Sequence, residues 1–388
     1  MESRLPEPSP DAQAASRLLS QRIADDIRAN GGWISFARYW ELALYTPGLG
    51  YYSGGSQKFG ASDEGGDFVT APELTPLFGQ ALARQVAQVM AASKPVVLEA
   101  GAGSGKLAAD LLQALDVLGQ TPKQYLILEL SGELRARQRE TIAKLAPALL
   151  DRVQWLDALP ERFSGCLVGN EVLDAMPVHR LRWDDEALLE IGVALDDQGN
   201  FIEQERPATA ALQIAIETLP AAAPYCSEVG LAGRAWTAEW AQRLEQGALL
   251  LIDYGLPRHE YYHPQRDGGT VRCHYRHRTH DDPYWWPGLS DITAHVDFTA
   301  IAEAAFDAGL DVLGYTTQAA FLMNCGIANL LAQRQQEGNA AAAVRASGAL
   351  NLLLSPNEMG ELFKVIALGR NIKEPLLGFA RADRLHTL

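Results

Sequence analysis

The sequence predicts a doubly wound α/β fold, and three observations lead to that prediction. From Pro95 onward, short apolar runs that end in turns alternate with stretches whose apolar residues recur at helical spacing. These runs are apolar throughout, which is typical of parallel strands buried on both faces of a sheet. The chain has 388 residues, 47% of them hydrophobic and 21% charged, so it has an ordinary globular composition and can bury a large core.

The segment before this alternation is expected to be helical and loop-rich. Apolar positions at helical spacing predict a helix over residues 12–30, which Gly31 and Gly32 close. The next stretch mixes aromatic residues with glycine and proline, so it predicts an ordered loop region that can act as a lid. A second amphipathic helix is expected over residues 74–90.

The alternating region supplies the predicted sheet. The expected order is a strand and glycine turn in 95–103, a helix in 106–115, a strand in 124–130, a helix in 132–145, a strand in 152–159, a fourth strand beginning at Cys166 and a fifth in 247–255. Because helices separate these strands, the sheet is predicted to be parallel.

Two insertions interrupt this pattern. Residues 181–207 alternate in a strand-like way around an Asp-Asp-Gln-Gly-Asn turn and predict a hairpin, and helices are expected over 209–219 and 236–245. A long loop then runs to residue 297, and a connection of that length is more often functional than idle. Helices over 298–309, 327–336 and 340–354 and a last strand over 363–370 complete the prediction.

These elements predict the following division of the chain. Residues 1–15 form a disordered tail, 16–92 a helical and loop cover, and 93–388 the sheet domain with insertions at about 180–235 and 256–297.

Charge and cysteine content exclude several classes of function. The 33 basic and 48 acidic side chains give a net charge of −15, so the global field repels nucleic acids and anionic membranes. The four cysteines are scattered and form no C-x-x-C pair, which fits reduced thiols. No apolar run has the length of a membrane span, and the acidic start resembles neither a signal nor a transit peptide. We expect a cytoplasmic protein without nucleic-acid partners and without membrane insertion.

The strongest motif is the glycine turn Glu99-Ala100-Gly101-Ala102-Gly103-Ser104-Gly105-Lys106, between a predicted strand and helix. A phosphate-binding P-loop requires glycine where Ala100 stands and a hydroxyl where Leu107 stands. A dinucleotide fingerprint requires a small residue where Lys106 stands. The third interpretation is the E-x-G-x-G-x-G turn of S-adenosylmethionine-dependent methyltransferases. There the glycines let the backbone approach the methionine part, and Glu99 offers negative charge to its ammonium group.

Two further acidic residues follow predicted strands. Glu129 ends the second strand, 28 residues after Gly101, where a carboxylate can accept both ribose hydroxyls. Asp157 follows the third strand and is expected to meet the adenine edge. Ligands of such sheets bind beyond the carboxyl ends of the strands, where all three candidates fall.

A dense polar run follows the fourth strand and is expected to face the transferred methyl group. Methyl transfer requires an aligned nucleophile and a site that fits the migrating charge. An arginine acceptor would need carboxylates, because its guanidinium stays protonated and pairs with them bidentately. Glu171 and Asp174 are the first candidates, and Glu73 and Asp291 are the candidates from loops. Asp174 can alternatively cap a helical turn before Pro177.

Five histidines gather in the long loop, namely His259, His263, His274, His277 and His280. They lack a companion cysteine pair or an H-E-x-x-H helix, so no metal site is predicted, and substrate binding or solvent exposure is expected instead.

Several blocks beyond the glycine turn resemble the MidA-like S-adenosylmethionine-dependent methyltransferases, a family that includes the mitochondrial methyltransferase assisting assembly of respiratory complex I. These blocks are GWISFARYWELALYTPGLGYY, GDFVTAPELTPLFGQ, LEAGAGSGKLAADLL, GNEVLDAMPVHR, LLIDYG and GTVRCHYRHRTHDDPYWWPGLSDITAHVDF, in this order. The resemblance extends from about Gly32 to Arg370. The segment ASDEGG, before Asp67, departs from it because other members look shorter there.

The resemblance implies a Rossmann-like class I methyltransferase fold. It also implies symmetric dimethylation of an arginine in a protein substrate, namely a complex I core subunit, and the acidic start fits a bacterial member. The implied cofactor residues are Glu99, Gly101, Gly103, Gly105, Glu129 and Asn170, with Asp157 added from its strand end. The implied catalytic residues are Asn170, Glu171 and Asp174, and the block with Asp67, Thr70, Pro72 and Glu73 is placed toward the active-site cover.

Two alternatives remain open at this point. One is methylation of a small molecule or of another side chain, which a narrow apolar site would favour. The other is an assembly factor that keeps the fold and the cofactor but acts by docking on a partner.

Overall fold

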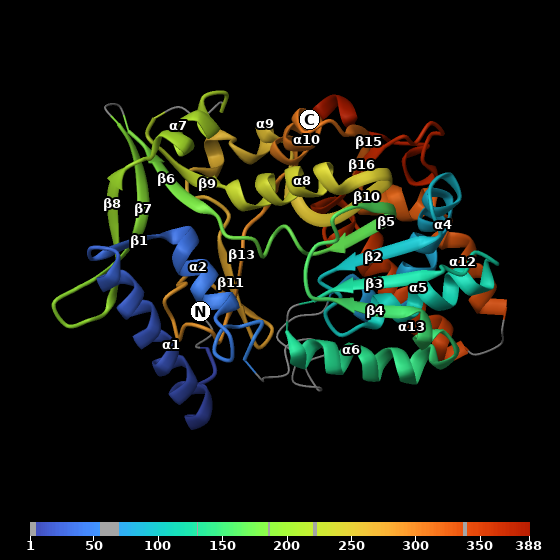
Figure 1. The fold of residues 1–388 in the computed structure, drawn as a ribbon, viewed down its shortest axis with the longest axis horizontal. Helices are drawn as coiled ribbons and strands as arrows, with labels where there is room; N and C mark the ends of the chain where they lie inside the picture. The colour runs from blue at the N-terminus through green and yellow to red at the C-terminus, as the bar shows by residue number, and fades with distance from the viewer. Residues whose placement is uncertain (1–4, 55–69, 130, 185–186, 220–222, 337–339) are drawn as a thin grey trace. The chain divides into compact units, whose positions relative to one another are not determined.

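The chain folds into two compact units. The computed structural model describes residues 5–54, 70–129, 131–184, 187–219, 223–336 and 340–388 (Figure 1). The first unit comprises residues 1–68, 173–235 and 257–297, and the second comprises 69–172, 236–256 and 298–388. The N-terminal segment and both predicted insertions therefore share one unit, whereas residues 69–92, predicted as part of the cover, belong to the sheet unit.

The second unit is built on a mostly parallel sheet, which confirms the predicted fold class. Its strands are β2 (Val96–Ala100), β3 (Gln124–Leu128), β4 (Val153–Leu156), β5 (Phe163–Asn170), β10 (Leu244–Leu256), β15 (Asp311–Thr317) and β16 (Phe363–Arg370). They lie in the order β15-β16-β10-β5-β2-β3-β4. The pairs from β10 to β4 are parallel, whereas β16 runs antiparallel to both of its neighbours. Figure 1 shows β5, β2, β3 and β4 side by side in this order.

The strand order creates one switch point, between β2 and β5. From β2 the chain passes to β3 and β4 on one side and then returns to β5 on the other side. Ala100 pairs with Gly169 across these two strands, so the glycine turn after β2 and the polar run after β5 leave the sheet side by side. Ligands of open α/β sheets bind at such a point.

Helices cover this sheet. They are α3 (Ala71–Leu74), α4 (Pro76–Ala92), α5 (Lys106–Val117), α6 (Gly132–Leu145), α10 (Phe298–Asp307), α11 (Gln318–Asn324), α12 (Ile327–Gln336), α13 (Ala340–Leu354) and α14 (Met359–Leu362), with short 3₁₀ turns at Pro147–Arg152, Leu377–Phe379 and Leu385–Thr387. Side chains of α4 and α5, including Leu82, Val86 and Leu111, form one buried core with the sheet strands. Gly79 lets the two helices approach closely, because a Cβ there would lie 2.7 Å from the Cβ of Asp110.

The first unit combines helices with two small sheets. Its elements are α1 (Pro10–Ala29), β1 (Trp33–Ser35), α2 (Phe36–Tyr45), β6 (His179–Trp183), β7 (Leu188–Leu195), β8 (Phe201–Pro207), α7 (Ala210–Ile216), β9 (Tyr225–Val229), α9 (Arg258–Tyr261), a 3₁₀ turn at Pro264–Arg266, β11 (Arg272–Tyr275), β12 (Arg278–His280), β13 (Asp291–Thr293) and β14 (Val296–Asp297). Helix α8 (Leu231–Arg243) passes from this unit into the other. The core of the first unit is rich in aromatic residues, among them Phe36, Tyr39 and Trp40.

Most predicted helices and strands are present, but the two predicted loop regions are partly wrong, because the first contains β1 and α2 and the second contains the β11–β13 sheet. Strands β7 and β8 form the predicted hairpin, with Asp196 accepting from the backbone amides of Gln198 and Asn200 in the turn. The predicted tail over residues 1–15 is wrong in part, because α1 already begins at Pro10. The Ser9 side chain caps α1, and proline is well accommodated in a first helical turn. Within the described ranges, no helix has both the length and the apolar character needed to cross a bilayer.

Candidate functional site

The turn between β2 and α5 has the backbone conformation that its glycines allow. Gly101, Gly103 and Gly105 have φ angles of +68°, +51° and +82°, values that other residues adopt only under strain. Gly105 is also packed tightly, because a Cβ there would lie 2.8 Å from the Cα of Gln138. The turn therefore requires glycine for its backbone conformation at all three positions and, at Gly105, for its close packing against α6.

Glu73 contacts this turn from α3. The hydroxyl of Ser104 donates a hydrogen bond to Glu73 Oε1, and the same hydroxyl accepts from the backbone amide of Lys106. The sequence placed Glu73 in the active-site cover. The structure joins it to the glycine turn, while Asp67 of the same motif lies outside the described residues.

Glu99 is buried inside the sheet unit, with 2% of its surface exposed. Its carboxylate accepts a hydrogen bond of 2.6 Å from the hydroxyl of Tyr125. Burial raises the pKa of Glu99 from 4.5 to about 7, and the hydrogen bond from Tyr125 opposes the shift. The sequence expected Glu99 to present negative charge to an ammonium group. In the described contacts its direct partner is a tyrosine.

Glu129 follows β3, and its carboxylate is held by two donors. The backbone amide of Ser131 donates to Oε1 at 2.9 Å, and the side-chain amide of Gln138 donates to Oε2 at 3.1 Å. The sequence identified Glu129 from its strand end. It gave no sign of Gln138, which is fully buried on α6.

Asp157 follows β4 and is largely exposed, with 91% of its side chain accessible. The guanidinium of Arg135 donates to its Oδ1 at 2.7 Å. Arg135 also donates to the backbone carbonyls of Glu129 and Leu156, so its guanidinium connects the ends of β3 and β4. Arg135 was not among the residues that the sequence singled out.

Asn170 and Glu171 form the tight polar turn at the end of β5. Glu171 has a φ of +54°, which is rare for a residue with a side chain and marks stored strain. Its amide donates to the carbonyl of Ile252, and the Asn170 side-chain amide donates to Glu171 Oε1 at 2.9 Å. Buried Asp253 accepts from the next amide, Val172, at 3.1 Å. The carboxylate of Glu171 is thus held by the Asn170 amide at the switch point.

Asp174 and Asp291, the two remaining carboxylate candidates, belong to the first unit. Both are buried, and the hydroxyl of Tyr52 donates to the two oxygens of Asp291 at 3.0 and 3.1 Å. Burial raises the pKa of Tyr52 well above its ordinary range, and the charges of Asp291 and Asp174 add to the shift. The backbone carbonyl of Asp174 accepts from Ala294, so the structure gathers these residues within one unit.

Among the described residues, no three His, Cys, Asp or Glu side chains converge. Burial lowers the pKa of His274 and of His280, whose Nε2 lies 3.0 Å from the hydroxyl of Ser290. These histidines are therefore part of the packing of the small β11–β13 sheet.

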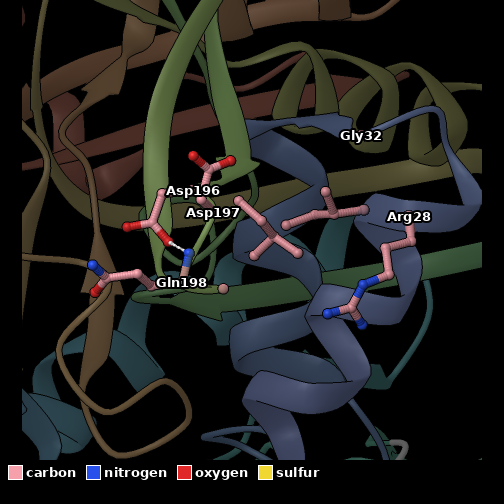
Figure 2. A pocket seen from close by; sticks show the side chains of 8 residues that line it. Arg28, Gly32, Asp196, Asp197 and Gln198 are labelled. Atoms are coloured by element: carbon pink, nitrogen blue, oxygen red, sulfur yellow. Dashed lines mark hydrogen bonds between the residues drawn. The ribbon is translucent and has the colours of Figure 1, made fainter.

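A shallow hollow of about 450 Å³ lies in the first unit between the end of α1 and the β7–β8 turn (Figure 2). Arg28, Asp196 and Gln198 line it, and none of the predicted site residues does. The carboxylate of Asp196 holds the turn itself by accepting from Gln198 and Asn200. We assign no role in the site to this hollow.

The residues around the switch point fit a nucleoside ligand with a charged amino-acid tail. The glycine turn follows β2 in a conformation that glycine adopts without strain, and Glu129 offers a carboxylate held by Gln138 after the neighbouring strand β3. Asn170 Oδ1 is buried and has no hydrogen-bond partner among the described residues. A buried acceptor of this kind is costly unless a ligand or water donates to it.

Comparison with known proteins supports this interpretation. Residues 81–316 match the family described as S-adenosyl-L-methionine-dependent methyltransferase. A crystal structure from Burkholderia thailandensis with S-adenosylhomocysteine bound is 53% identical, covers 99% of this chain and 100% of its own, and superposes with a TM-score of 0.95. The protein arginine methyltransferase NDUFAF7, mitochondrial, is 28% identical in Danio rerio over 92% of this chain and 88% of the relative. The Homo sapiens protein is 28% identical over 87% of this chain and 80% of the relative.

Proposed function

This chain belongs to the family of S-adenosyl-L-methionine-dependent methyltransferases, and we propose that its methyl acceptor is the guanidinium of an arginine in a protein. Its similarity to the mitochondrial arginine methyltransferases supports this acceptor, since the alignment spans most of both chains. We extend the proposal to symmetric dimethylation of a subunit of the respiratory complex I type, which is the substrate that the family resemblance implies.

The cofactor residues that we propose lie along the carboxyl ends of β2 to β5. Gly101, Gly103 and Gly105 would hold the methionine part, with the buried acceptor of Asn170 available to its ammonium group. Glu129 would hold the ribose hydroxyls, and Asp157 would lie at the adenine end. When bound, S-adenosylmethionine supplies a methyl group that is electrophilic because it is attached to a sulfonium sulfur.

The observation that carries the proposal is the carboxylate of Glu171, a residue with a strained backbone. It follows the strand that pairs with the strand of the glycine turn, and both its backbone and its side chain are held by hydrogen bonds. A carboxylate fixed there can orient a guanidinium through two N–H groups and localise its positive charge. The remaining nitrogen can then donate its electron pair to the methyl carbon as the carbon–sulfur bond breaks, and its proton passes to the carboxylate or to water.

The other proposed carboxylates have supporting roles. Glu73 would stabilise the glycine turn through Ser104 as well as facing the acceptor, because its hydrogen bond to that hydroxyl is already formed. Asp174 and Asp291, both buried, are proposed to contribute to acceptor binding. We also propose a reducing compartment such as a bacterial cytoplasm, since all four cysteines are free thiols in the structure.

The test begins with ligand binding. Calorimetric titration with S-adenosylhomocysteine should show saturable binding, with NADH and ATP as negative controls. Labelled S-adenosylmethionine should then transfer its methyl group to a complex I type subunit, and acid hydrolysis should release symmetric dimethylarginine.

Matched variants separate the proposed acceptor from its alternatives. Glu171→Gln should abolish transfer while S-adenosylhomocysteine affinity stays within about twofold, and exposed Glu161→Gln should behave as wild type. Label in a small molecule, or in a residue other than arginine, would overturn the arginine assignment. Binding of the subunit without any methylation would indicate an assembly factor instead.

A further inference from the structure

Gln138, on helix α6, connects the separate segments of the proposed cofactor site. Its side chain is fully buried, and its amide nitrogen donates to the carbonyl of Gly103 at 3.2 Å and to Glu129 Oε2 at 3.1 Å. Its amide oxygen accepts from the indole nitrogen of Trp155, on β4, at 2.9 Å. One buried amide thus reaches the glycine turn after β2, the carboxylate after β3 and the strand that leads to Asp157.

The orientation of this amide is determined by its partners. An indole N–H is a donor only, so the group that faces Trp155 must be the amide oxygen. The amide nitrogen is then directed to the other side, where both partners are acceptors: a carbonyl oxygen and a carboxylate oxygen. A flipped amide would set its nitrogen against the indole N–H and its oxygen against the Glu129 carboxylate. The three contacts therefore support one orientation.

We propose that Gln138 is a positioning residue for S-adenosylmethionine, which fixes the carboxylate of Glu129 for the ribose hydroxyls and braces the glycine turn. The inference rests on the ribose role proposed above for Glu129. The amide nitrogen holds Oε2 while the Ser131 backbone amide holds Oε1, so the two donors set the plane of the carboxylate. Gln138 also lies against Gly105 through its own backbone, which leaves no room for a Cβ in the turn.

Packing alone does not account for a glutamine at this position. A buried amide costs free energy unless every polar atom is satisfied, and an aliphatic side chain of similar size would fill the same space without that requirement. All three of the hydrogen bonds named above reach segments that carry proposed cofactor residues. The glutamine is therefore placed to organise a ligand site.

The test measures S-adenosylhomocysteine affinity by calorimetry in four variants of the full chain. Gln138→Leu removes the amide, Glu129→Ala removes the carboxylate, and a third variant combines both. Gln85→Leu is the matched control, because Gln85 is also fully buried in the same unit but bonds to Gly378 and Gln88, away from the site. Thermal unfolding without ligand shows how much stability each variant loses.

If Gln138 acts through Glu129, Gln138→Leu weakens binding by about tenfold or more, whereas Gln85→Leu changes it by less than about twofold at similar loss of stability. In the Glu129→Ala background the same Leu substitution should cost at least about threefold less, because the residue through which it acts is gone. Equal losses in both backgrounds, or an effect no larger than that of the control, would overturn the inference.

Two further outcomes keep the test decisive. If Glu129→Ala leaves the affinity for S-adenosylhomocysteine unchanged, the proposed ribose role of Glu129 is wrong, whatever Gln138→Leu does. If Glu129→Ala weakens binding but Gln138→Leu does not, the positioning role of Gln138 is wrong and the ribose role of Glu129 stands. Should Gln138→Leu not fold, Trp155→Phe replaces it, because it removes the donor that orients the amide and keeps an aromatic ring beneath the Arg139 guanidinium. It should weaken binding about threefold in the wild-type background and by a smaller factor in the Glu129→Ala background. Unchanged affinity in both backgrounds, or equal losses in both, contradicts the proposal.

Discussion

The hydroxyl of Tyr125 donates a hydrogen bond of 2.6 Å to the carboxylate of Glu99 between two adjacent strands of a buried sheet. Both side chains are almost completely buried, so the carboxylate is removed from water and has its pKa raised to about 7. Burial disfavours the charged form, and one neutral donor offsets only part of that cost. A site residue is therefore held near half protonation at neutral pH.

We predict that Glu99 makes the protein less stable as the pH rises from about 4.5 to 7. Below 4.5 the carboxyl is protonated in both the folded and the unfolded chain. Between the two values only the unfolded chain ionises, so folding loses about 3 kcal/mol in total across this window. Urea unfolding of wild type and Glu99→Gln at pH 5 and pH 8 measures the loss, which the variant should lack. A free-energy difference between the two proteins that stays constant with pH would contradict the assignment.

A second prediction concerns the strain at Glu171. Glycine adopts a φ of +54° without penalty, so Glu171→Gly should raise the free energy of unfolding by up to about 1 kcal/mol while abolishing methyl transfer. Chemical denaturation and a labelled-methyl assay measure the two effects. His277→Gly is a suitable comparison, because His277 also has a positive φ, +58°, but lies in the β11–β12 turn. It should gain similar stability and keep its activity. A destabilised Glu171→Gly protein would show that the side chain supports the fold.

The sequence predicted the fold better than it predicted the contacts that shape the site. Strands such as β2 and β5 can be predicted from the sequence, because a strand buried on both faces of a sheet requires a continuous apolar run. Glycines at a strand-to-helix turn are equally visible. The role of Gln138 could not be predicted from the sequence. Its partners Gly103, Glu129 and Trp155 lie 35, 9 and 17 residues away, and only folding brings them together. The positive φ of Glu171 likewise arises from the tertiary contacts that hold it.

The third prediction separates backbone strain from steric conflict in the glycine turn. Gly105 and Gly119 flank helix α5 with φ angles of +82° and +67°, but a Cβ would meet Gln138 only at Gly105 and would find open space at Gly119. Gly119→Ala should therefore cost about 1 kcal/mol of stability, and Gly105→Ala about 2 to 4 kcal/mol. Denaturant midpoints report both values. Only Gly105→Ala should also lose S-adenosylhomocysteine binding, and equal costs at the two positions would argue against the close contact with α6.

The last prediction concerns Tyr52 and Asp291, which lie 239 residues apart in the sequence. Tyr52→Phe removes the hydroxyl that donates to both oxygens of a buried carboxylate, so it should lower the free energy of unfolding by about 1 to 3 kcal/mol. Tyr45→Phe removes a hydroxyl that donates to the backbone carbonyl of Ala175 instead, and it serves as the comparison within the same stacked pair. If Asp291 contributes to acceptor binding as proposed, only Tyr52→Phe should change the KM for the protein substrate by about threefold or more, with the affinity for S-adenosylhomocysteine preserved. A lower stability with an unchanged KM would place Asp291 in the support of the first unit rather than in recognition of the acceptor.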